Sequence, residues 1–239
     1  MIQNSFLLFA LFLSVSLSAA PTREAFALEE RAVSGIPIEA FELGDPNLKI
    51  ELWARSPMIF SPVAMDFDAK GRLWTTEGID YQRGMRIKEG RSIMVLEDKD
   101  RDGQADSSHV FITEKEIRHA ALGIAVFDNR IVLSSTPSII VYTDVNRNAV
   151  FDEGLDKREV FLTGFRDASH DHTLHAVVGA PSGQWHFSYG NRGADIKTKD
   201  GRHFISGCYY GYVDGIGKKS SDGEVYVGGM SMRVNPDGT

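Results

Sequence analysis

The residues of this 239-residue chain that are best suited to chemistry begin with an acidic stretch, 98–106. It carries carboxylates at alternating positions around Gly103, and its candidate oxygen donors are Asp98, Asp100, Asp102, Gln104 and Asp106. Oxygen ligands spaced in this way around a tight turn suit a hard cation such as Ca²⁺. An EF-hand would also need flanking helices and a glutamate at its twelfth position, which is His109 here. We predict a calcium loop between two strands; a solvated acidic turn is the alternative.

A second stretch, 144–153, repeats this spacing with fewer charges. Its candidate ligands are Asp144, Asn146, Asn148 and Asp152. Fewer carboxylates weaken the affinity of such a loop for a cation. Asn and Asp side chains also hydrogen-bond readily to the backbone of their own loop. The stretch is therefore either a weaker calcium loop or a loop held by such turns.

Three histidines gather between residues 170 and 175, directly before an apolar run. Their spacing allows a metal site, but a neutral imidazole can also accept a proton from a substrate hydroxyl near pH 7. His172 and His175 are the candidates for a catalytic base that faces a central channel. The alternative is that these side chains hydrogen-bond to backbone groups at strand ends.

A glycine-rich loop, 190–195, follows the next apolar run and contains Asn191 and Arg192. A guanidinium forms strong hydrogen bonds with carboxylates, so Arg192 suits an anionic ligand or a cofactor carboxylate. A solvated arginine is the alternative. We take Asn191 and Arg192 as candidate cofactor ligands.

The elements that must position these residues are short runs rich in Val, Ile, Tyr, Phe and Trp, which begin at residue 48. Three hairpins resemble one another, and the residues at corresponding places are Leu73, Ile131 and Trp185. A third strand, which begins at Ser92, Ser138 and Ser231 and leads into an acidic turn, and a fourth strand leading back complete the unit. Four antiparallel strands repeated in this way are typical of β-propeller blades, which bury both faces by packing radially. We predict an all-β fold, a partial β-propeller with about four blades of a six-bladed ring; a sandwich or β-meander is the alternative.

The N-terminus predicts export. Residues 6–17 form an apolar run followed by small residues, the pattern of a signal peptide over residues 1–20. The run is shorter than the roughly 20 apolar residues that span a bilayer, so we expect no membrane span after cleavage; an uncleaved anchor or a buried strand is the alternative. Residues 21–47 then form a lead-in segment, and residues 48–239 form an incomplete propeller of a longer protein. We expect a periplasmic or cell-surface location.

Composition limits the classes of function. The net charge of −7 argues against a nucleic-acid partner, because such proteins need a basic surface. Cys208 is the single cysteine, so the chain itself has no internal disulfide, four-cysteine zinc site or haem attachment motif. The apolar setting of Cys208 indicates a packing role.

At these residues the chain resembles a known family. Residues 48–239 are similar to the N-terminal propeller of the membrane-bound dehydrogenases of planctomycete and verrucomicrobial type, which are related to L-sorbosone and soluble quinoprotein glucose dehydrogenases. The matching segments are 61–74, the acidic loop from Asp98, and 171–183. The resemblance implies pyrroloquinoline quinone and calcium as cofactors and His172 as the general base, with His175 further along the strand. It also implies haem c in a downstream part of the protein.

The sequence therefore favours an exported quinoprotein-type dehydrogenase that oxidises a sugar or another alcohol. Its electron acceptor would be a protein such as a c-type cytochrome. Two alternatives stay open: a non-catalytic, calcium-stabilised propeller that binds carbohydrate or protein, and a calcium-dependent lactonase-like propeller. The first predicts calcium-dependent melting without quinone affinity, and the second predicts lactone hydrolysis without quinone.

Overall fold

The structure is a computed structural model in which residues 37–78, 90–115, 117, 121–166, 172–208 and 217–239 are described. The predicted signal peptide, residues 1–20, and the first part of the predicted lead-in segment lie outside these residues. The described part of the lead-in segment contains one short 3-10 helix, η1 (Ile38–Ala40). Within the described ranges, no helix is long and apolar enough to cross a membrane.

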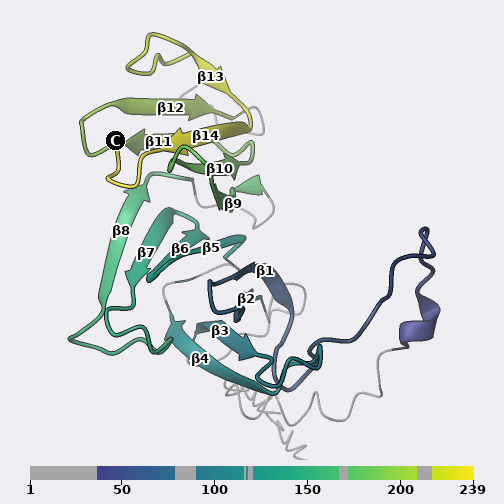
Figure 1. Ribbon diagram of the computed structural model, residues 1–239. Helices are drawn as coiled ribbons and strands as arrows, with labels where there is room; N and C mark the ends of the chain where they lie inside the picture. The colour runs from purple at the N-terminus through teal and green to yellow at the C-terminus, as the bar shows by residue number, and fades with distance from the viewer. Residues whose placement is uncertain (1–36, 79–89, 116, 118–120, 167–171, 209–216) are drawn as a thin grey trace, which may run out of the picture.

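All other regular elements of the described chain are β-strands, joined by turns and loops, which confirms the predicted all-β class (Figure 1). The strands are β1 (Pro62–Phe67), β2 (Leu73–Glu77), β3 (Arg91–Glu97), β4 (Ser107–Glu114), β5 (Gly123–Phe127), β6 (Arg130–Ser135), β7 (Ser138–Thr143), β8 (Lys157–Thr163), β9 (Leu174–Gly179), β10 (Trp185–Tyr189), β11 (Ala194–Lys197), β12 (His203–Gly207), β13 (Tyr226–Val227) and β14 (Met230–Val234).

The first eight strands form two antiparallel sheets with the same topology, β1-β2-β3-β4 and β5-β6-β7-β8. In both sheets each strand pairs with the next one along the chain. The residues predicted to be equivalent share one register, because Leu73 pairs with Leu96 and Ile131 pairs with Tyr142. The predicted repeat of four antiparallel strands is therefore present twice in succession.

The third sheet departs from this pattern. β9 and β10 form the predicted hairpin, and β14 pairs with the other edge of β10, where Trp185 lies opposite Val234. Between β10 and β14 the chain forms a separate sheet, β11-β12-β13, in which β12 and β13 run parallel. The four sheets are thus three repeats and one insertion, not about four successive blades.

The three repeats pack face to face in chain order (Figure 1). Between the first two sheets, the Phe111 ring of β4 lies edge-on to Tyr142 of β7, with ring centroids 5.8 Å apart. Within the first sheet the same ring lies edge-on to Trp74 at 5.1 Å. Between the second and third sheets, Trp185 stacks on Phe127 with centroids 5.4 Å apart. Aromatic rings therefore join each repeat to the next.

The first strands of the three repeats lie side by side, since β1 contacts β5 and β5 contacts β9. The Val126 amide donates to the Asp66 carboxylate at 2.8 Å, which ties the ends of β5 and β1 together. At Gly123 a Cβ atom would lie 2.7 Å from the Ala176 Cα, so only glycine permits the approach of β5 to β9. Adjacent first strands and sheets packed in succession make the arrangement propeller-like.

The turn between β1 and β2 is held by Asp68, whose side chain is 6% exposed. One carboxylate oxygen accepts the Lys70 and Arg72 amides at 2.9 and 3.0 Å. The other accepts Arg72 Nε at 2.6 Å and Trp74 Nε1 at 3.0 Å. Burial disfavours the charged form, but the hydrogen bonds from Trp74 and Arg72 outweigh it and hold the pKa of Asp68 below its ordinary value.

Candidate functional sites

The first acidic loop folds its carboxylates inward. The Asp98 carboxylate accepts the amides of Asp102 and Gly103 at 3.2 and 3.0 Å, and Asp100 accepts the Asp102 amide at 3.1 Å. Gly103 has a left-handed φ of 92°, which lets the loop turn sharply. Ligand oxygens of Asp98, Asp100 and Asp106 lie within 4.8 Å of one another. The structure therefore brings together three of the predicted ligands.

The other two predicted ligands of this loop, Asp102 and Gln104, contact each other. Asp102 is outside the converging group, and its carboxylate accepts the Gln104 amide at 2.8 Å. The Asp106 carboxylate accepts the Lys99 amide at 2.5 Å and the Asp100 amide at 3.3 Å. Asp106 thereby closes the loop on itself as well as facing Asp98.

The second acidic loop has the same backbone path. Asp144 takes the place of Asp98 and accepts the amides of Asn148 and Ala149 at 3.2 and 2.8 Å. Arg147 has a left-handed φ of 62°, as does Arg101 in the first loop. The repeated spacing in the sequence therefore corresponds to a repeated loop structure.

The side chains of the second loop hydrogen-bond to one another, unlike those of the first loop. The side-chain amides of Asn146 and Asn148 both donate to one Asp152 oxygen, at 2.7 and 2.8 Å. Among the described residues, the one cluster of acidic or other ligating side chains suited to a cation is in the first loop. This network matches the alternative of a loop held by Asn and Asp turns, and calcium binding by the second loop stays a prediction.

Both loops connect neighbouring parts of the fold. The Phe151 amide of the second loop donates to the Phe111 carbonyl of β4 at 2.9 Å, and His109 Nε2 lies 2.9 Å from the Ala149 carbonyl oxygen. In the first loop, the Ala105 amide donates to the Trp53 carbonyl at 2.8 Å. The second loop therefore joins the first two repeats, and the first loop joins the first repeat to the segment that precedes it.

The second candidate site lies where the third repeat begins. His172 is exposed, and its Nδ1 is 2.8 Å from Asn191 Oδ1. The Gly190 amide donates to the Thr173 carbonyl at 2.7 Å. At Gly190 a Cβ atom would lie 2.4 Å from the His172 carbonyl carbon and oxygen, so glycine is required for this approach. The structure thus brings together the predicted base and one predicted cofactor ligand.

The other two predicted residues lie close in sequence to this pair. Arg192 follows Asn191 and is half-buried. His175 lies inside β9, and it is also half-buried. His172 and His175 therefore occupy different settings, one before the strand and one within it.

The acidic loops and His172 lie at opposite ends of the sheets. β3 runs parallel to β1, because both are antiparallel to β2, so the loop after β3 lies where β1 ends. His172 instead lies where β9 begins. β9 and β5 run in the same direction, since Gly123 meets Ala176 near their starts and Phe127 meets Gly179 at their ends. An ion in the first acidic loop would therefore be remote from His172.

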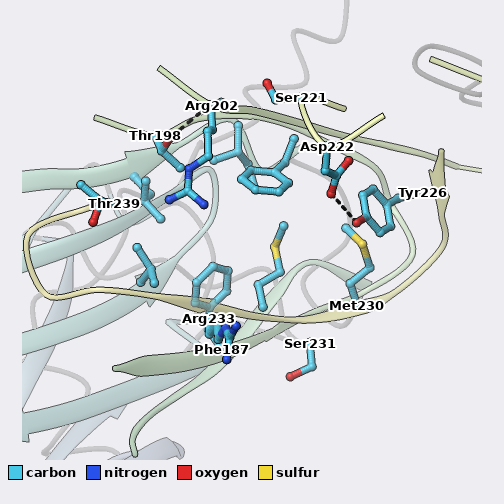
Figure 2. A pocket seen from close by; sticks show the side chains of 15 residues that line it. Phe187, Thr198, Arg202, Ser221, Asp222, Tyr226, Met230, Ser231, Arg233 and Thr239 are labelled. Atoms are coloured by element: carbon cyan, nitrogen blue, oxygen red, sulfur yellow. Dashed lines mark hydrogen bonds between the residues drawn. The ribbon is translucent and has the colours of Figure 1, made fainter. Parts of the chain in front are cut away.

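The structure also contains two cavities that the sequence did not indicate. A groove of about 330 Å³ follows β1, β5 and β9, and Asp66 is the one ionisable residue in its lining. A cavity of about 520 Å³ separates the third sheet from the inserted sheet, with apolar side chains in its centre and Arg202 at one side (Figure 2). At its rim the Tyr226 hydroxyl donates to Asp222 at 2.6 Å. The lining of each cavity comes from segments far apart in sequence, so no local sequence pattern predicts either cavity.

A family model described as a domain of unknown function, DUF7133, matches residues 38–219. The chain belongs to the DUF7133 family. The match covers all of the first two repeats and, in the third, the His172–Asn191 pair. No curated protein is significantly similar in sequence to this DUF7133 chain.

Solved structures resemble parts of the DUF7133 chain. Two are a calcium and an iodide structure of a Trichoderma reesei carbohydrate-active enzyme of family AA12, each with 16% identity and a TM-score of 0.39; they cover 56% of this chain and 30% and 31% of theirs. Another, designated a gluconolactonase, has 17% identity and a TM-score of 0.39, and covers 62% of this chain and 47% of its own. The chain thus spans less than half of each structure, and these scores are too low to assign a fold or a function.

Proposed function

We propose that this protein is a quinoprotein-type dehydrogenase of propeller fold that oxidises a sugar or another alcohol, with His172 as its general base. One observation carries the proposal, the contact of 2.8 Å between His172 Nδ1 and Asn191 Oδ1. A carboxamide oxygen can only accept a hydrogen bond, so Nδ1 holds the proton and Nε2 is the basic nitrogen of the ring. Asn191 thereby favours the tautomer in which Nε2 accepts the proton.

The chemistry follows from this arrangement. The Nε2 atom of His172 accepts the proton of the substrate hydroxyl, and Asn191 keeps the ring oriented while it becomes charged. When bound, pyrroloquinoline quinone would supply the two-electron acceptor. The donors present suit a cofactor that carries carboxylates, because Arg192, the residue after Asn191, carries a guanidinium. Asn191 and Arg192 are accordingly the residues we assign to holding it.

Calcium belongs to the same proposal, with a structural role in the first acidic loop. Asp98, Asp100 and Asp106 bring carboxylate oxygens within 4.8 Å of one another, a spacing that suits a cation with oxygen ligands. This loop lies at the end of the sheets opposite to His172. The ion would therefore stiffen the junction next to Trp53 and would not touch the substrate.

The remaining parts of the proposal rest on the sequence alone. The apolar run 6–17 supports export to the periplasm or cell surface, with cleavage near residue 20. Electrons would leave through an acceptor such as a c-type cytochrome, with haem c in another part of the protein.

The non-catalytic alternative also has an observation in its favour. Both acidic loops hydrogen-bond to a neighbouring segment, through the Phe111 and Trp53 carbonyls, so their ordering serves the fold. A calcium-stabilised propeller that only binds carbohydrate or protein would use them in the same way. It differs from the dehydrogenase in giving His172 no chemical role.

The test is dye reduction by the protein supplied with quinone and calcium, across a panel of sugars and alcohols. We expect turnover with at least one substrate and a loss of about 10²-fold or more in kcat for His172→Gln. His203→Gln, on the inserted sheet, is the matched control and should keep the activity. Reduction of no substrate, or equal rates for the two variants, would overturn the proposal. Lactone hydrolysis without quinone would instead support the lactonase alternative.

A further inference from the structure

The loop that carries Asn191 and Arg192 lies where the third repeat departs from the second. In the second repeat, β6 and β7 pair up to a tight turn at residues 136–137. In the third repeat the corresponding connection, residues 190–229, contains the inserted sheet. Asn191 and Arg192 therefore belong to the first residues of the insertion, and the contacts that fix this part of the insertion also fix these two residues.

The connector between β8 and β9 holds the start of the insertion in place. The Gly164 and Phe165 amides both donate to the Pro137 carbonyl of the second repeat at 3.2 Å. On its other edge, Phe165 forms an antiparallel bridge with Ala194. The Asp195 amide donates to the Gly164 carbonyl at 2.8 Å, and a Cβ atom at Gly164 would lie 1.9 Å from the Asp195 carbonyl oxygen, so glycine is required for this approach. The connector therefore joins the second repeat to the insertion.

Arg166 follows Phe165 on this connector and contacts the end of the 190–193 loop. Its amide donates to the Gly193 carbonyl at 3.2 Å. A Cβ atom at Gly193 would lie 3.3 Å from both Cδ and Nε of Arg166, so the side chain lies directly against the Gly193 backbone. Gly193 also has a left-handed φ of 88°, which favours glycine. The backbone and the side chain of Arg166 therefore both hold the end of the loop.

Arg166 also interacts with the residue that precedes the loop. Tyr189, the last residue of β10, is 3% exposed, and its ring centroid lies 5.7 Å from that of Phe165. Burial raises the pKa of the Tyr189 phenol, as does Cys208, and the positive charge of Arg166 acts in the opposite direction. The Arg166 guanidinium is therefore close enough to act on the Tyr189 hydroxyl while its stem lies on Gly193. Arg166 thus interacts with both ends of the loop.

The geometry points to Arg166 as a positioning residue for the His172–Asn191 pair. The loop is fixed at Gly190, which packs on the His172 backbone, and at Gly193, which packs on Arg166. Asn191 lies between these two points, so its contact with His172 depends on both. Arg166 thereby acts through Asn191 to keep the imidazole proton on Nδ1 and to leave Nε2 basic. This inference rests on the proposed function, because it concerns the same base.

The tautomer of the neutral His172 ring tests this role in the full chain, without quinone or substrate. Nitrogen NMR spectra of imidazoles distinguish a protonated from an unprotonated nitrogen, and the signals that His172→Gln removes are those of His172. In the parent chain we expect the form with the proton on Nδ1 to predominate. Arg166→Ala should change the ratio of the two tautomers about tenfold toward protonated Nε2, because the loss of a hydrogen bond from Asn191 has about this effect. Arg166→Lys keeps the charge and most of the stem, so its ratio should stay within about threefold of the parent.

Arg202→Ala is the matched control. Arg202 lies at the other end of the β11–β12 hairpin from the loop, and its side chain is 49% exposed. Its replacement should leave the tautomer ratio of His172 unchanged. An unchanged ratio in Arg166→Ala, an equal change in both variants, or a parent ring protonated on Nε2 would overturn the role of Arg166. If Arg166→Ala does not fold, Arg166→Gln takes its place, with the same direction of change expected and an unchanged ratio having the same consequence.

The outcome can be separated from the test of the proposed function. A tautomer change in Arg166→Ala, together with a quinone-loaded parent that reduces no dye, would refute the dehydrogenase and leave Arg166 as the residue that positions His172. Dye reduction by the parent with an unchanged tautomer ratio would refute only the role of Arg166. Where the parent turns over, Arg166→Ala should lower kcat about tenfold with little change in KM, and Arg166→Lys should restore it to within about threefold.

Discussion

Replacing Asp68 by asparagine should lower the free energy of unfolding, because the replacement breaks two of the hydrogen bonds that hold the turn between β1 and β2. The substituted carboxamide keeps an oxygen for the Lys70 and Arg72 amides, but its NH₂ group would face Arg72 Nε and Trp74 Nε1. The Trp74 side chain is buried, and the Arg72 side chain is 13% exposed. Leaving one buried donor and one charged donor unpaired costs about 3 kcal/mol in the free energy of unfolding.

Urea unfolding of Asp68→Asn against the parent chain measures this loss, and Asp128→Asn is the matched control. Asp128 occupies the corresponding turn of the second repeat but is 70% exposed, so its replacement should change little. The pKa of Asp68 in the folded state is below the ordinary value of 3.8. Its stabilisation is therefore present above pH 3.8 and disappears as the pH falls through the folded pKa, so the parent and variant should converge in acid. Equal losses from Asp68→Asn and Asp128→Asn, or a gap that persists in strong acid, would refute the reasoning.

Three further outcomes are expected. Calcium should raise the melting temperature of the parent chain, and Asp100→Asn should remove most of that rise; an unchanged rise would exclude Asp100 as a ligand. Gly190→Ala should lower kcat/KM at least tenfold by displacing the loop from the backbone of His172, whereas Gly44→Ala, in open space, should not. Arg158→Ala should lower the free energy of unfolding by about 1 kcal/mol in chemical denaturation, because it removes a two-point ion pair with Glu114 that joins the first two sheets. An unchanged free energy of unfolding would show that the ion pair contributes nothing to stability.

The sequence predicted the parts of the fold that local pattern controls. Strand–turn–strand units around Leu73 and Ile131 could be recognised because each hairpin closes within a few residues. The segment at Ser231 resembles the third strands at Ser92 and Ser138, and β14 does pair with β10 as the third strand of its repeat. The separate sheet inserted between β10 and β14 was not predicted. The strands of that insertion are short, like the blade strands, so their sequence does not distinguish a further blade from a separate sheet.

The candidate sites show the same division. The alternating carboxylates of 98–106 predicted the convergence of Asp98 and Asp100, because both lie on one tight loop. His172 and Asn191 were both candidates, yet their contact depends on the close packing of Gly190 against the His172 backbone, which no spacing rule reveals.

The insertion between β10 and β14 has a consequence for how the protein folds. The first two sheets consist of neighbouring strands, so their contacts close short loops and can form early. The third sheet must instead bring β14 back to β10 across the whole of β11, β12 and β13. Its loop-closure entropy is larger, and compaction of the inserted sheet shortens the distance that β14 must cover. The third sheet should therefore be the last to acquire native protection, with the insertion acting as its folding scaffold.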